Sequence, residues 1–85
     1  MKMFVFAVRD EKSGLFALPW FVASRGIAVR MFTDEVNRVA SDNVMNKHFA
    51  DFCLCALGEF DNVSGMFESK VPEQVCDGSI VHVPV

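Results

Sequence analysis

The spacing of apolar residues changes along this chain, and each spacing predicts a different element. Residues 3–8 are apolar at every position, which is typical of a strand covered on both faces. The polar segment 10–14 ends in glycine, as a five-residue hairpin loop often does, and residues 15–23 return as a second apolar strand. Because Pro19 has no N–H to donate, we expect this strand to lie at a sheet edge or to bulge near its middle.

A helical spacing follows. Ser24 is a favourable N-cap, and the apolar residues after it recur three or four positions apart. They are Ile27, Ala28, Met31, Phe32, Val36 and Val39, and Glu35 is the polar residue on the same face. This pattern predicts an amphipathic helix that ends near residue 40, where residues with a preference for turns begin.

Alternation typical of a strand returns in residues 52–60, and a second polar turn, residues 61–65, again ends in glycine. The four residues after this turn complete a second hairpin. We expect the tail, residues 70–85, to form a loop around Pro72 and to be less ordered, with a last short strand over residues 79–83 as an open alternative.

This order of elements predicts one α+β domain over residues 1–85. Two hairpins, in the order ββαββ with a fifth strand as an alternative, form an antiparallel sheet, and one amphipathic helix packs on a face of it. The expected core consists of Phe4, Phe6, Val8, Phe16, Ile27, Met31, Phe32, Val36, Leu54 and Leu57.

The aromatic content is unusual for a core of this size. The chain has 85 residues, nine of them phenylalanine and one tryptophan, but no tyrosine. A domain this small has limited interior volume. We therefore expect some of the rings to lie at a subunit interface or on a ligand-binding face, and we expect a homo-oligomer.

No segment has the pattern of a signal peptide or of a membrane span. The longest apolar run, residues 15–23, is about half as long as a spanning helix and contains Pro19. Three cysteines, an odd number, argue against a disulfide-bonded secreted scaffold. These features predict a cytosolic protein without a membrane partner.

Cys53 and Cys55 are the first candidates for chemistry. In a strand they are neighbours on one face, and with Cys76 and His82 or His48 they have the residue types of a Cys₃His zinc site. Structural zinc sites, however, usually place their paired cysteines two to four residues apart on a tight turn. Free cysteine is commonly buried as a small hydrophobe, so the pattern favours a packed face over a metal or redox site.

Nothing in the sequence indicates catalysis. His48 and Asp51 have the spacing of a pair on one helical turn, but no nucleophile accompanies them. The chain also lacks a phosphate-binding glycine loop. We therefore predict a protein that is not an enzyme and that has no catalytic residues and no cofactor.

Nucleic acid is the better-supported ligand class. Single-strand binders combine a positive groove with exposed aromatic rings. Residues 1–50 carry seven basic and five acidic side chains, against one basic and six acidic in residues 51–85. This asymmetry is typical of a basic face on an acidic protein, although a chain this short also produces it by chance. The sequence pI of about 5.2 weighs against tight phosphate binding.

Several short motifs follow one another in an order found in a known phage family. They are Pro19-Trp20-Phe21-Val22-Ala23; Ala28, Arg30, Phe32, Asp34, Val36 and Asn37; Lys47, His48, Asp51 and Phe52; and Leu57, Gly58, Phe60, Asp61, Gly65 and Phe67. Over residues 2–70 the chain resembles the small nonstructural protein of gokushoviruses, single-stranded DNA phages of the Microviridae. Phe49 and Ala50 stand where that family commonly has Pro-Glu, and the tail beyond Val71 has no counterpart.

The resemblance implies a nonstructural phage protein that binds DNA and aids the switch from genome replication to single-stranded DNA synthesis and packaging. We predict sequence-tolerant binding of single-stranded DNA by a homo-oligomer in the host bacterial cytoplasm. The candidate phosphate contacts are Lys12, Arg25, Arg30 and Arg38, and the candidate stacking residues are Trp20 and Phe21. The alternative is a protein-interaction module that binds a phage replication or capsid protein and never touches DNA.

Overall fold

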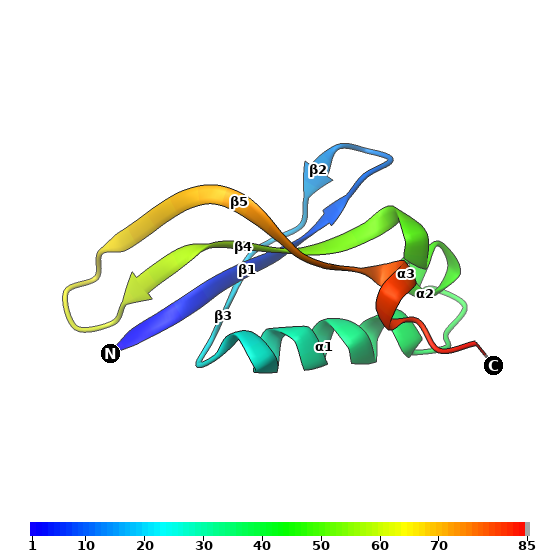
Figure 1. Cartoon of the computed structure of the whole chain (residues 1–85), viewed down its shortest axis with the longest axis horizontal. Coiled ribbons are helices and arrows are strands. Elements are labelled where there is room, and N and C mark those ends of the chain that lie inside the picture. Colours follow the sequence, from blue (N-terminus) through cyan, green and yellow to red (C-terminus); the bar gives the residue numbers. More distant parts are fainter. Residues whose placement is uncertain (85) are drawn as a thin grey trace.

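The computed structural model describes residues 1–84 and has a five-stranded antiparallel sheet with one long helix across a single face (Figure 1). The strands are β1 (Lys2–Asp10), β2 (Leu15–Phe16), β3 (Trp20–Val22), β4 (Phe52–Asp61) and β5 (Phe67–Asp77). The helices are α1 (Arg25–Asn37), α2 (Val44–Lys47), the 3₁₀ turn η1 (Phe49–Asp51) and α3 (Gly78–Val81). The predicted α+β class, with two hairpins and one helix on a face, is confirmed.

Strand β1 is at the centre of the sheet. The order is β2–β1–β4–β5, and β3 pairs with β1 on the same side as β2. The predicted second strand is therefore divided in two around Pro19, and both parts lie at the sheet edge, as the missing N–H of proline requires. The fifth strand of the sheet arises from this division and not from the tail.

Helix α1 is fixed at both ends by side chains. The Ser24 hydroxyl accepts a hydrogen bond from the N–H of Ile27 at 3.3 Å, which confirms the predicted N-cap. At the other end the buried Asn43 amide donates to the carbonyl oxygens of Glu35 and Arg38, both at 2.8 Å. The helix ends at Asn37, before the predicted residue 40, because this amide takes up its last carbonyls.

The face of the sheet that α1 covers holds the main core, and we call it the covered face. Four of the ten predicted core residues are buried there: Phe6, Phe32, Val36 and Leu54. Val8 and Ile27 are partly buried against them. Four predictions were wrong: Phe4, Phe16 and Met31 are exposed, and Leu57 is only half-buried at a bulge in β4. Phe4 lies beyond the start of the helix, and Phe16 lies on the other face of the sheet.

The tail differs most from its prediction. Residues 70–77 continue β5, and residues 78–81 form α3, so neither the loop nor a strand over residues 79–83 is present. Pro72 is tolerated because β5 is an edge strand, and residues 70–72 lie opposite Leu57 alone. Val85 lies outside the described residues.

Side chains attach this tail to the rest of the fold. The amide of Asn37 donates to the carbonyl of Val81 at 3.0 Å and accepts from the N–H of Val83 at 2.7 Å. The ring of His82 stacks on Phe49 with centroids 3.8 Å apart. Residues 81–83 therefore cover the end of α1.

The two adjacent cysteines pack as apolar side chains, as predicted. Cys53 and Cys55 are both buried, and their Sγ atoms are 3.8 Å apart. The Cys53 thiol donates to a carboxylate oxygen of Glu11 at 3.3 Å, and burial together with this contact raises the pKa of Cys53 to about 12. A thiol with such a pKa stays protonated at neutral pH, which disfavours both metal binding and nucleophilic chemistry.

Candidate nucleic-acid interface

The helices found in residues 1–84 leave the second face of the sheet uncovered, and we call it the open face (Figure 1). Successive residues of a strand point to opposite faces, so Phe6 of β1 faces α1 whereas Met3, Val5 and Arg9 face the other way. Cross-strand partners share a face. The pairs Val5–Phe21, Met3–Phe60, Phe60–Phe67 and Arg9–Phe16 therefore place four phenylalanines on the open face.

Three of these rings form one group, the aromatic cluster of Phe21, Phe60 and Phe67. Their centroids are 5.5 Å apart for Phe21–Phe60, 4.8 Å for Phe60–Phe67 and 6.2 Å for Phe21–Phe67, and all three pairs are tilted. Phe21 is 42% exposed and Phe67 is 60% exposed. Tilted aromatic pairs stabilise one another by about 0.5–1.5 kcal/mol each, so the cluster is held in place while ring surface stays accessible.

The fourth ring lies at the far end of the same face. The guanidinium of Arg9 lies over Phe16 at 5.7 Å from the ring centroid and is 3.5 Å from the carboxylate of Glu11. Lys12 follows in the turn between β1 and β2. From Met3 to Arg9 the strand advances by about 20 Å. The open face thus has aromatic rings at both ends and cationic residues near one of them.

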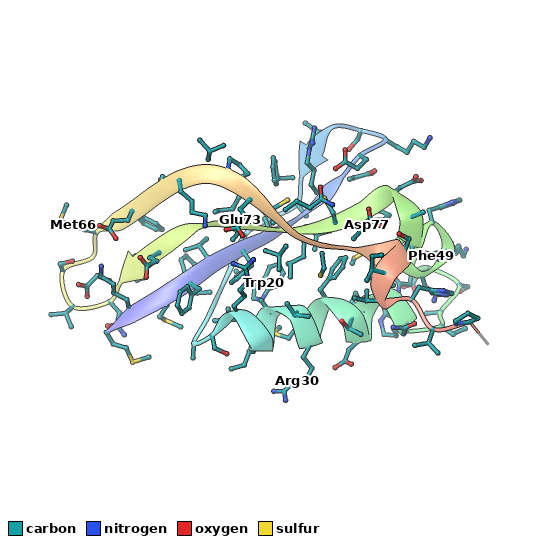
Figure 2. All side chains as sticks on the ribbon, in the orientation of Figure 1. Trp20, Arg30, Phe49, Met66, Glu73 and Asp77 are labelled. Atoms are coloured by element: carbon teal, nitrogen blue, oxygen red, sulfur yellow. The ribbon has the colours of Figure 1, made fainter. Side chains whose placement is uncertain are left out.

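The predicted site residues do not share one surface. Figure 2 shows Trp20 between the sheet and α1, and Arg30 pointing away from the sheet on the outer side of the helix. Trp20 packs against the core at 6.4 Å from the ring of Phe6, and its indole N–H is buried with no hydrogen-bond partner in residues 1–84. Arg25 and Arg38 flank α1 at opposite ends, about 20 Å apart. Of the six residues, Phe21 alone is placed on the open face by the strand pairing, and Lys12 lies in the turn at its end.

Two of the four predicted cationic residues are in ion pairs. Arg25 donates to Glu73 at 2.8 Å, and Arg38 donates to Glu35 at 2.6 Å. These hydrogen bonds lower the pKa of Glu35 and, with a further one from Lys70, lower that of Glu73 to about 2. Lys12 and Arg30 form no ion pair within the described part of the chain.

Sequence reasoning missed Phe60 and Phe67 as site residues. A strand with apolar side chains on both faces gives no indication of which face a single helix will cover. The signal that was present is their position around the turn. Phe60 and Phe67 are the residues just outside Asp61 and Met66, which a backbone hydrogen bond of 2.9 Å joins, and they become cross-strand partners.

Comparison with known proteins gives one family. The model of the family described as Phage ORF5 protein matches residues 3–81. No curated protein and no solved structure matches the chain. None of the helices found in residues 1–84 has the length and hydrophobicity that crossing a membrane requires.

Proposed function

The chain belongs to the Phage ORF5 protein family, and we propose that it binds single-stranded DNA on the open face of its sheet. It acts without catalysis in the host bacterial cytoplasm and aids the switch from genome replication to single-stranded DNA synthesis and packaging. This role is the one that the resemblance to gokushovirus nonstructural proteins implies.

The aromatic cluster is the observation that carries the proposal. Stacking of a base on an aromatic side chain contributes about 1–3 kcal/mol and tolerates any sequence, because every base has a π-face. Exposed phenylalanines on an antiparallel sheet are also the surface on which common RNA-binding modules stack bases. Phe21 and Phe67 supply that surface here.

The charges of the open face set the expected salt dependence. Arg9 and Lys12 lie near Phe16 at one end, and the chain as a whole has a net charge of −3. Each phosphate neutralised on a single strand contributes about −0.7 to the slope of log K against log salt, so two contacts give a slope of about −1.4. Binding is therefore expected to depend more on stacking than on charge.

Fluorescence anisotropy with an oligo-dT strand at low salt tests the proposal. We expect Phe67→Ala and Phe21→Ala each to weaken binding about tenfold or more, as the loss of one stacked base predicts. Phe4→Ala is the matched control, since Phe4 is 37% exposed but faces the covered side of the sheet. No binding at low salt, or an equal loss in all three variants, would sink the proposal.

A protein partner is the second candidate, and the ion pairs favour it. Arg25 and Arg38 are engaged by carboxylates, so few free cations remain to hold a DNA backbone. In this case the open face binds a phage replication or capsid protein through the same exposed rings. The outcome that selects it is retention of that partner by the native protein and its loss in Phe67→Ala, with no affinity for oligo-dT at any salt concentration.

A further inference from the structure

A groove of about 520 Å³ lies on the covered face, beyond the start of α1. Figure 1 shows why it exists: β1, β4 and β5 extend past the N-terminal end of the helix, which leaves this part of the face uncovered. Gly58 allows β4 and β5 to approach each other beside the groove, because a Cβ on it would lie 2.0 Å from the carbonyl oxygen of Glu68. The volume is in the range of small-molecule sites.

One end of the groove is cationic. Arg25 and Lys70 line it, and both donate to Glu73, at 2.8 and 2.6 Å. Two cations share one carboxylate, so this end carries a net positive charge. A guanidinium has five N–H donors and an ammonium has three, so most of their donors are not used by Glu73. An anionic group such as a phosphate is the ligand that this end suits.

The other end is rich in acceptors. Glu59 and Glu68 are cross-strand partners there, and Glu68 is paired with Lys2 at 3.3 Å. Glu59 forms no ion pair in residues 1–84, so its two oxygens are available to N–H donors.

An aromatic ring lies beside the acceptor end. Phe4 lines the groove and is the partner of Glu59 across β1 and β4. Ala56, the partner of Glu73, lies three residues before Glu59 on β4, which corresponds to about 10 Å. The groove therefore presents cations at one end and, about 10 Å away, an aromatic ring beside carboxylate oxygens, a span that one nucleotide can bridge.

We propose that this groove binds a single nucleotide, with guanine as the preferred base. The phosphate lies at Arg25 and Lys70, the base stacks on Phe4, and the base edge donates to Glu59. Guanine has two adjacent N–H donors, N1 and N2, which match the two oxygens of a carboxylate, whereas thymine has a single N–H. The site goes beyond the proposed DNA binding, since it lies on the opposite face of the sheet and needs none of the aromatic cluster.

Calorimetric titration of the full chain with dGMP, dTMP and inorganic phosphate tests the site. We expect dGMP to bind at least tenfold more tightly than dTMP or phosphate. Arg25→Gln should weaken both nucleotides about tenfold, and Glu59→Gln should bring dGMP to the level of dTMP. Arg30→Gln is the matched control for Arg25, because Arg30 points away from the sheet (Figure 2) and should leave every affinity unchanged.

Three outcomes overturn the proposal: no binding of dGMP at millimolar concentration, equal affinity for dGMP and dTMP, or phosphate alone binding as tightly as dGMP. A pair of variants separates this site from the open face. Phe4→Leu keeps the apolar volume but removes the ring, and should lose dGMP while keeping oligo-dT. Phe67→Ala should keep dGMP whatever it does to oligo-dT. Nitrogen–proton NMR spectra of each variant confirm that it is folded.

Discussion

The two faces of this sheet are built from the same apolar strands but differ in how far they are covered. On the covered face Phe6 and Leu54 are almost completely buried beneath α1. On the open face Phe21 and Phe67 remain exposed, although Val5 and Ala7 of the central strand β1 are buried there. A sheet that is apolar on both sides needs cover on both, and residues 1–84 supply a single helix long enough to cover one of them. The comparison teaches that the uncovered side is where a binding surface is to be sought.

The largest expected difference in stability is between two variants that each remove one ring, one from each face. Phe32 of α1 is fully buried against the covered face, so Phe32→Ala leaves a cavity and should lower the free energy of unfolding by about 3–5 kcal/mol. Phe67→Ala removes an exposed ring and should cost about 1 kcal/mol or less. Urea unfolding of both variants measures the difference. Equal losses would mean that the open face belongs to the core.

Glycine substitutions test the close approach of β4 to β5, two strands that contribute to both faces of the sheet. At Gly58, φ is +144° and a Cβ would meet the backbone of Glu68, so Gly58→Ala should destabilise the protein by about 2–4 kcal/mol. Gly65 also has a positive φ, +75°, but nothing lies within 4 Å of its Cβ position. Gly65→Ala should therefore cost only about 1–2 kcal/mol. A smaller loss at Gly58 than at Gly65 would contradict the packing described for the groove.

Alkaline pH probes the buried part of the open face. Folding raises the pKa of Cys53 from its ordinary 9.0 to about 12, so its contribution to stability is complete below pH 9 and is lost as pH rises towards 12. Between pH 8 and pH 10 the free energy of unfolding should fall by about 1.4 kcal/mol more in the native protein than in Cys53→Ala. Urea unfolding at the two pH values provides the measurement. The same pH slope in both proteins would show that the thiol is not buried in solution.

The smallest effect concerns the charged end of the groove on the covered face. With Arg25 and Lys70 donating to it, the Glu73 carboxyl should titrate near pH 2. Arg25→Gln should move that pKa back towards the ordinary value, since it removes the largest of the interactions that lower it. Carbon-detected NMR titration follows this group directly. A native value above 4 would show that the ion pairs do not persist in solution.

Much of the fold was accessible from the sequence because local rules decide it. Ser24 predicts the start of α1, and Pro19 predicts an edge strand; both are confirmed. The second half of β5 was missed because Pro72 was read as the centre of a loop. In a central strand proline removes a hydrogen bond between strands and therefore ends the strand. In an edge strand the missing N–H can face solvent, so no such hydrogen bond is lost. At Pro72 a loop and an edge strand both fit the local pattern, and the tertiary position of β5 at the sheet edge decides between them.

The candidate site was less accessible than the fold for the same reason. Whether a cation is free depends on partners that are distant in sequence: Arg25 meets Glu73, 48 residues later. Whether a ring is exposed depends on which face the helix covers. The sequence predicts Phe21 as a stacking residue but gives Phe60 and Phe67 no role beyond the motif that carries the family resemblance. Only the three-dimensional arrangement shows that these two rings lie on the open face.

The pairing of β1 with β4 also sets when the protein can fold. Strand β1 is synthesised before the other strands of the sheet, but its longest ladder is with a strand that begins at Phe52, and the end of α1 is completed by hydrogen bonds to Val81 and Val83. Sheets built on such distant contacts fold slowly, in milliseconds to seconds. The chain must therefore be synthesised as far as Asp61 before β1 gains its main partner. Until then the apolar residues of β1 need protection from aggregation, which a host chaperone is suited to give.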